Sequence, residues 1–146
     1  MYVCYRPRRT FPLNVPLIIA GSLAVVAAFI HGIAGEILVV RKLSVERLAP
    51  SPFGGPRMTK AMIHVTWHIA TFAFLTVGVA LLLAGTVLNG DAEQAIALIG
   101  AVAMTGFAGL AMGVGIAYMR SPRTLVRHPG PAVLALTAAL AWWGAV

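Results

Sequence analysis

The chain has 146 residues; 60% of them are hydrophobic, only 10% are charged, and the mean hydropathy is +0.89. A soluble domain carries about 25% charged residues, so this composition excludes a soluble globular domain and indicates an integral membrane protein. The formal net charge is +7. Because the Lys and Arg residues gather at the ends of apolar segments, as they do beside membrane spans, we expect no nucleic-acid partner. The single cysteine, Cys4, excludes an internal disulfide and a Cys-rich metal site.

Four apolar segments follow one another along the chain. A membrane-spanning helix needs about 20 apolar residues, and the sequence predicts spans at about 15–40, 61–88, 95–119 and 129–146. The last apolar run, 131–146, is short for a hydrocarbon core of ~30 Å. The predicted fold is therefore an all-α integral membrane protein, with a single membrane domain over 1–146 that forms a bundle of four transmembrane helices.

The loops between these segments differ in charge and in the residues that break helices. Three prolines between residues 41 and 60 predict a loop that folds back, whereas the short turn at 89–94 makes the second and third helices an antiparallel hairpin. Five Lys and Arg lie in the first loop, three in the third, none in the second, and three before the first span. The positive-inside rule then predicts a multi-pass protein of the bacterial inner (plasma) membrane with both termini extracytoplasmic.

Small residues recur at helical spacing in three of the segments. Such residues let membrane helices approach closely. The positions expected at helix contacts are Gly78 and Gly85 in the second segment and Gly109 and Gly113 in the third. Either these contacts form within the four-helix bundle, or the third helix docks another membrane subunit or a second copy of the chain. The lipid bilayer is the remaining expected partner.

Four ionisable side chains interrupt the apolar segments. His31 and Glu36 lie near the end of the first segment, and His64 and His68 lie near the start of the second. An ionisable group in hydrocarbon is costly, so such residues usually face the interior of a bundle and mark a functional site. Their depth in the membrane groups these four residues further. At 1.5 Å per residue, Glu36 is level with His64, and His31 is level with His68. We therefore expect all four in one polar pocket near the cytoplasmic side.

This group supports four interpretations. The first is a buried hydrogen-bond network in which Glu36 pairs with His64, Arg41 or Lys60. The second is a transition-metal site for zinc, iron or copper, formed by His64 and His68 with His31 or Glu36. His31 and Glu36 lie ~140° apart on a regular helix, so sharing one ion requires a kink, for which Gly32 and Gly35 are placed.

The third interpretation is a tetrapyrrole site. His31 and His68 would bind haem b or a (bacterio)chlorophyll from opposite helices. The fourth is a proton relay, because histidine titrates near neutrality. The sequence contains no clear nucleophile–base pair, Gly-rich phosphate loop or dinucleotide fingerprint, which argues against an enzyme.

A family resemblance covers roughly residues 20–85. The pattern His-x-x-x-Gly-Glu, from His31 to Glu36, and the pattern Trp-His-x-x-Thr, from Trp67 to Thr71, resemble a set of small bacterial four-helix integral membrane proteins. The resemblance implies the fold and groups His31, Glu36 and His68, but it implies no activity.

These observations lead to one principal functional hypothesis and two alternatives. The principal hypothesis is a non-catalytic accessory or assembly subunit of a larger bacterial membrane complex, respiratory or photosynthetic, because the loops are too short to form a catalytic domain. The first alternative is a metal-, haem- or chlorophyll-binding membrane protein with a redox or carrier role. The second is a small proton or ion transporter.

Overall fold

The computed structural model describes residues 12–119 and 128–146, and within these ranges the chain is helical with no β-strand. This confirms the predicted all-α class. Three helical segments are long and apolar enough to cross a membrane, and a fourth apolar helix is shorter. In chain order the elements are α1 (Val15–Phe29), the π-helix η1 (Ile30–Ala34), α2 (Gly35–Leu38), two short 3₁₀ turns, α3 (Pro56–Thr86), α4 (Gly90–Met119) and α6 (Gly130–Ala145).

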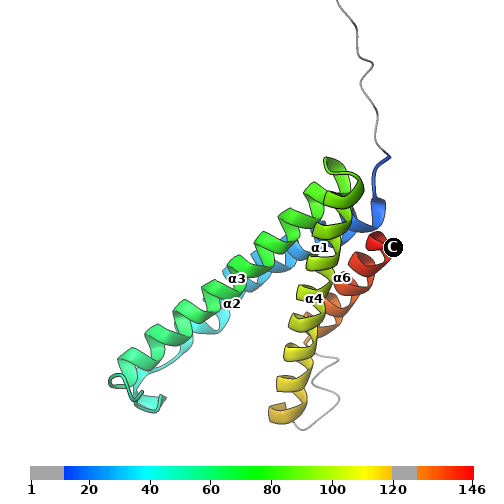
Figure 1. The fold of residues 1–146 in the computed structure, drawn as a ribbon. Coiled ribbons are helices and arrows are strands. Elements are labelled where there is room, and N and C mark those ends of the chain that lie inside the picture. Colours follow the sequence, from blue (N-terminus) through cyan, green and yellow to red (C-terminus); the bar gives the residue numbers. More distant parts are fainter. Residues whose placement is uncertain (1–11, 120–127) are drawn as a thin grey trace, which may run out of the picture.

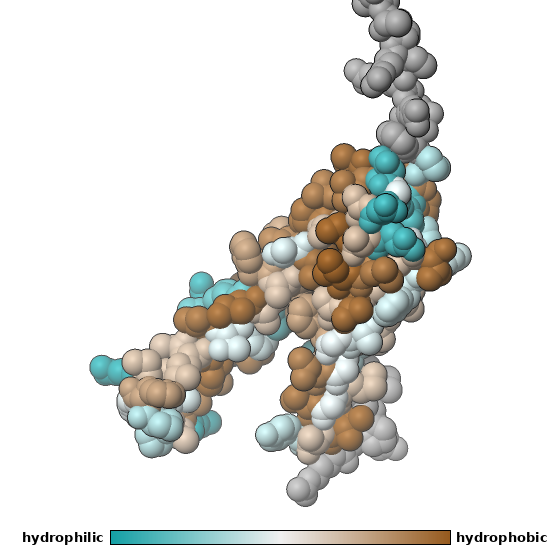
Figure 2. All heavy atoms as spheres, viewed as in Figure 1, coloured by the Kyte–Doolittle hydropathy of each residue, from teal (hydrophilic) through white to brown (hydrophobic). Residues whose placement is uncertain are grey.

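The helices form two arms that meet at one end and diverge toward the other (Figure 1). The first arm consists of α1, η1 and α2 packed against α3, and the second consists of α4 packed against α6. At the closed end lie the start of α1, the turn between α3 and α4, and the end of α6. Figure 2 shows hydrophobic surface along both arms, with hydrophilic residues gathered at the closed end and at the free end of the first arm.

Local sequence explains where the helices begin. Asn14 caps α1 by accepting a hydrogen bond from the backbone N–H of Leu17, and prolines stand in the first turns of α1, α3 and α6. Both features favour a helix N-terminus. Gly90 starts α4 with φ +58°, a left-handed conformation that glycine adopts without steric cost. The reversal between α3 and α4 is therefore specified by the sequence at this glycine.

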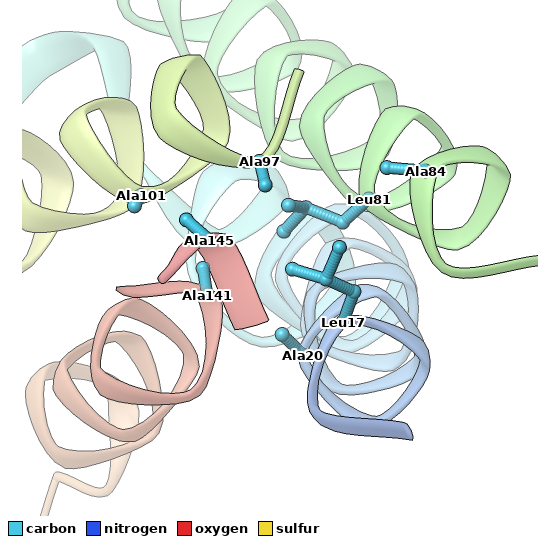
Figure 3. Packing of buried hydrophobic residues seen from close by; sticks show 8 residues of the cluster. All are labelled: Leu17, Ala20, Leu81, Ala84, Ala97, Ala101, Ala141 and Ala145. Atoms are coloured by element: carbon cyan, nitrogen blue, oxygen red, sulfur yellow. The ribbon is translucent and has the colours of Figure 1, made fainter. Parts of the chain in front are cut away.

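A compact apolar core holds the two arms together at the closed end (Figure 3). Leu17 from α1 and Leu81 from α3 fill its centre and are fully buried. The surrounding positions are small, which allows four helices to meet around two leucines. They are Ala20, Ala84, Ala97, Ala101, Ala141 and Ala145. A second buried cluster continues the core toward the open end, with Met104 at its centre.

Glycines of α3 lie directly against α1. A Cβ added to Gly78 would lie 2.9 Å from the backbone nitrogen of Val25, and one added to Gly85 would lie 3.0 Å from the backbone oxygen of Asn14. Neither position has room for a side chain without movement of the backbone. The absence of side chains at these two positions therefore sets the close approach of α1 and α3.

The glycines of α4 behave differently. A Cβ added to Gly109 or Gly113 would meet no described atom within 4 Å, and both residues are exposed. Among the described residues these two glycines therefore make no helix contact within the bundle, and the alternative of a contact with a partner helix stays a prediction. The physical reason is that α4 turns a different face inward: Met104 and Ala108 pack against Leu134 of α6, and the glycine face points outward.

Candidate metal site

Three of the four predicted site residues meet at the free end of the first arm. Nε2 of His64 lies 3.2 Å and Nε2 of His68 lies 3.5 Å from Oε2 of Glu36. The three donor atoms all lie within 4.8 Å of one another. Ligands bound tetrahedrally at 2.0–2.1 Å from a zinc ion are separated by about 3.3–3.4 Å. The two histidine–carboxylate distances match this spacing, and the two imidazole nitrogens lie within 4.8 Å of each other, so the three donors are close enough to share one metal ion.

The histidines reach this position because they lie one helical turn apart on α3. Residues at i and i+4 share a helix face, and the two imidazole rings have their centroids 4.9 Å apart with an interplanar angle of 52°. Thr71 continues this seam one turn deeper, where its side chain contacts Gly32 of η1. The ordinary geometry of α3 thus presents both rings toward the end of the first helical segment.

Glu36 reaches the same point through the π-helix. In a regular α-helix each four-residue step turns 400°, so three steps from the buried Ala24 would carry Glu36 about 120° away from the side that faces α3. The π-helix η1, Ile30–Ala34, lies between them. Its i→i+5 turn contains one extra residue, which reduces this rotation by about 100°. The bulge therefore returns Glu36 to the side of α3.

The two oxygens of the Glu36 carboxylate have different partners. Arg41 Nε donates to Oε1 at 3.3 Å, while Oε2 faces the two imidazoles. The Glu36 side chain is only 13% exposed, whereas the Arg41 side chain is 70% exposed. Arg41 therefore fixes the orientation of the carboxylate from the outside and leaves its inner oxygen to the histidines.

That inner oxygen has an unusual environment. Oε2 of Glu36 is buried, and no described group donates a hydrogen bond to it, although His64 Nε2 and His68 Nε2 lie within 3.5 Å. The short distances without hydrogen-bond geometry mean that the rings do not direct an N–H at the carboxylate. An unpaired buried carboxylate oxygen is costly. A cation bound between the three donors would satisfy all of them at once.

His31 lies apart from this cluster. Its ring stacks on Trp67 with centroids 4.2 Å apart and an interplanar angle of 9°, and its edge meets Phe74. Trp67 Nε1 also donates a 3.0 Å hydrogen bond to the His31 carbonyl oxygen. The expectation of a four-residue pocket is therefore corrected to three residues, because stacking on Trp67 holds His31 on another side of α3. There it lines a groove of about 590 Å³ beneath the loop that carries Pro50 and Pro52.

A tetrapyrrole between His31 and His68 does not fit this packing. The two helices touch at this depth: a Cβ added to Gly32 would lie 2.7 Å from the Thr71 methyl group, and Gly35 lies directly beneath the Trp67 indole. A ring inserted between opposing histidines requires the helices to stand apart. The contact therefore leaves no room for haem b or a chlorophyll in that position.

The pair of Glu36 with Arg41 is one of the alternatives that the sequence offers, and the structure contains it. The π-helix is the contributor that the sequence does not predict, beyond a kink at Gly32 and Gly35. The sequence does carry a weak signal for the bulge. Positions spaced by four drift about 40° per step around a regular helix, so a series of small residues with this spacing does not stay on one side. Glu36, at the end of the series, leaves the side that faces α3 unless one turn is widened.

Comparison with known proteins gives no match: no family model, no curated protein and no solved structure matches this chain. The candidate site therefore stands on the geometry of Glu36, His64 and His68.

Proposed function

We propose that the chain is a multi-pass protein of the bacterial inner membrane that binds a divalent transition-metal ion through Glu36, His64 and His68. The observation that carries the proposal is the buried Oε2 of Glu36, which has two imidazole nitrogens within 3.5 Å and no hydrogen-bond donor among the described residues. Two histidines and one carboxylate are ordinary ligands for Zn²⁺ and Fe²⁺. Three protein ligands leave at least one coordination position for another ligand.

The membrane assignment follows from composition and helix length. Three helical segments have the length and hydropathy of membrane spans, and exposed apolar side chains cover both arms. The Lys and Arg count supports an orientation with the loop between α2 and α3 in the cytoplasm. The proposed metal site then lies near the cytoplasmic surface, one or two turns inside the apolar region.

A cobalt titration tests the metal proposal. Co²⁺ replaces Zn²⁺ in nitrogen and oxygen sites and gives visible absorption bands that report its coordination. We expect one equivalent of Co²⁺ to bind the purified protein in nanodiscs, and Glu36→Gln and His64→Ala to lose that binding. His128→Ala is the matched control, because His128 is an exposed histidine at the other arm. Equal binding by the wild type and Glu36→Gln would overturn the proposal.

A second candidate function, an accessory or assembly subunit of a larger membrane complex, is favoured by the outer face of α4. Added Cβ atoms at Gly106, Gly109 and Gly113 would meet no described atom, and small residues spaced in this way suit close docking of another membrane helix. Blue native electrophoresis of membranes tests this role. We expect Gly113→Leu to release the chain from a larger assembly and Val102→Leu, at an exposed position of the same helix, to leave it in place. Identical migration of both variants would contradict it.

A further inference from the structure

The metal site borders a shallow, open groove on the exposed face of α3, and all the residues that line this groove belong to that helix. His64 and His68 form one end of the groove, and Val65, Ile69, Phe72 and Ala73 form the rest of its wall. Its volume is about 680 Å³, and it is open to the surroundings along its length. The same imidazoles therefore serve the metal site and the groove, so a molecule in the groove has direct access to the metal.

The groove lies on the side of α3 away from the second arm. Phe74 packs edge-on against Phe107 of α4, and Phe72 lies two residues earlier, about 200° around the helix. Accordingly, Ile69 is 62% and Phe72 is 70% exposed. No described helix covers this wall. In a bilayer it faces the hydrocarbon, and a molecule dissolved in the membrane reaches it without passing through the protein.

The charge at the end of the groove is strongly positive. The loop region from Arg41 to Lys60 holds five Lys and Arg and one acidic residue, Glu46. A hydrogen bond from Ser44 lowers the pKa of Glu46, which keeps it ionised. Arg41, one of these five residues, bonds Glu36 and places an exposed guanidinium beside the metal donors. A divalent cation at the site would increase this positive charge. The groove therefore has a cationic end and an apolar body.

We infer that the groove binds a single-chain fatty carboxylate, whose head group becomes an additional ligand of the metal and whose acyl chain lies along Val65, Ile69 and Phe72. The inference rests on the proposed metal site. A carboxylate is a common ligand of Zn²⁺ and Fe²⁺ at about 2.0–2.2 Å. From His64 to Ala73 the groove runs ~13.5 Å along α3, from the loop end toward the middle of the apolar segment. An acyl chain in a bilayer runs in the same direction.

The test uses the Co²⁺-saturated protein in phosphatidylcholine nanodiscs, with the visible bands of Co²⁺ as the readout. Decanoate is expected to change the bands, because a new oxygen ligand enters the coordination sphere. Decanol has the same chain without the charge, and acetate has the head group without the chain, so neither is expected to do so at equal concentration. Decanoate makes the bilayer anionic and so raises the Co²⁺ concentration at its surface. Because the protein is already saturated with Co²⁺, this increase does not change the bands.

Two variants link the spectral change to the groove. Phe72→Ala is expected to raise the decanoate concentration for half-maximal change by on the order of tenfold, because it removes the largest apolar side chain of the wall. Leu83→Ala, an exposed apolar position of α3 outside the groove, is expected to have no effect.

Each other outcome decides the question. If decanoate does not change the Co²⁺ bands, this inference is overturned and the metal proposal is unaffected. An equal response to acetate means ordinary anion ligation, and an equal response to decanol means apolar partitioning; both overturn it. If phosphatidylglycerol changes the bands as strongly as decanoate does, the inference is overturned and the ligand is a phospholipid head group instead. Absence of any Co²⁺ bands in the wild type overturns the metal proposal and this inference together.

Discussion

Asn14 joins four helices at the closed end of the molecule. Its side-chain oxygen caps α1, its side-chain nitrogen donates to Glu93 of α4 and to the carbonyl oxygen of Gly144 in α6, and its backbone N–H donates to Gly85 of α3. Because the arms touch mainly at this end, a single amide organises their junction.

Replacing this amide should therefore loosen the junction. We expect Asn14→Ala to lower the free energy of unfolding by about 1–3 kcal/mol, from the lost N-cap and the acceptors left without a partner. Thermal unfolding in detergent measures the effect. Asn89→Ala, which removes an exposed asparagine at the nearby turn, is the control and should change stability by less than about 0.5 kcal/mol. Equal effects of the two variants would show that the Asn14 network contributes nothing specific.

At the scale of elements, the seam between α1 and α3 depends on glycine. The added Cβ of Gly78→Ala would lie 2.9 Å from backbone and side-chain atoms of Val25, so we expect a loss of about 1–3 kcal/mol from overpacking. Gly113→Ala makes the same chemical change on the open face of α4. There the higher helix propensity of alanine should leave the monomer unchanged or more stable by up to about 1 kcal/mol. Unfolding of the two variants side by side measures the contrast, and a reversed order would contradict the packing described here.

The π-helix is the second element with a testable consequence. Deleting Ile33, an exposed apolar residue within η1, should convert the wide turn into a regular one and leave Glu36 on the side of α3, because the lost residue is the one that the bulge accommodates. Inserting one alanine between Ala34 and Gly35 adds a residue beyond the bulge and should rotate Glu36 by about 100° away from the histidines. We expect the deletion variant to keep Co²⁺ binding and the insertion variant to lose it, while the far-UV circular dichroism of both stays helical. Ile33→Ala keeps the residue count and should keep the binding. If the insertion variant binds Co²⁺ as tightly as the wild type, the rotational position of Glu36 has no part in forming the site.

At the scale of the whole molecule, the charge asymmetry predicts an orientation. With Cys4 replaced, a cysteine at Asp91 should react with a membrane-impermeant thiol reagent added outside intact cells. A cysteine at Gly55 should react only after the membrane is opened. Both positions are exposed in the structure, so accessibility within the protein does not limit either reaction. The opposite labelling pattern would invert the topology and place the metal site at the outer surface.

The sequence predicted the helical class and the meeting of Glu36 with His64 and His68, because hydropathy and depth along a helix are local properties that residue spacing records. It did not predict the position of His31, since the choice between the metal cluster and the Trp67 indole depends on how α1 and α3 pack. For Gly109 and Gly113 it left two alternatives, a contact within the bundle or with a partner. A glycine pattern permits a close contact but does not say which helix face turns inward.

The central claim is that Glu36, His64 and His68 coordinate one metal ion, and X-ray absorption spectroscopy of the zinc-loaded protein tests it most directly. The account predicts a first shell with two imidazole nitrogens at about 2.0–2.1 Å and oxygen ligands completing the coordination. A shell of oxygen alone would contradict it, because the metal would then be bound outside the cluster. So would three imidazoles, because His31 would then have to leave its stack on Trp67.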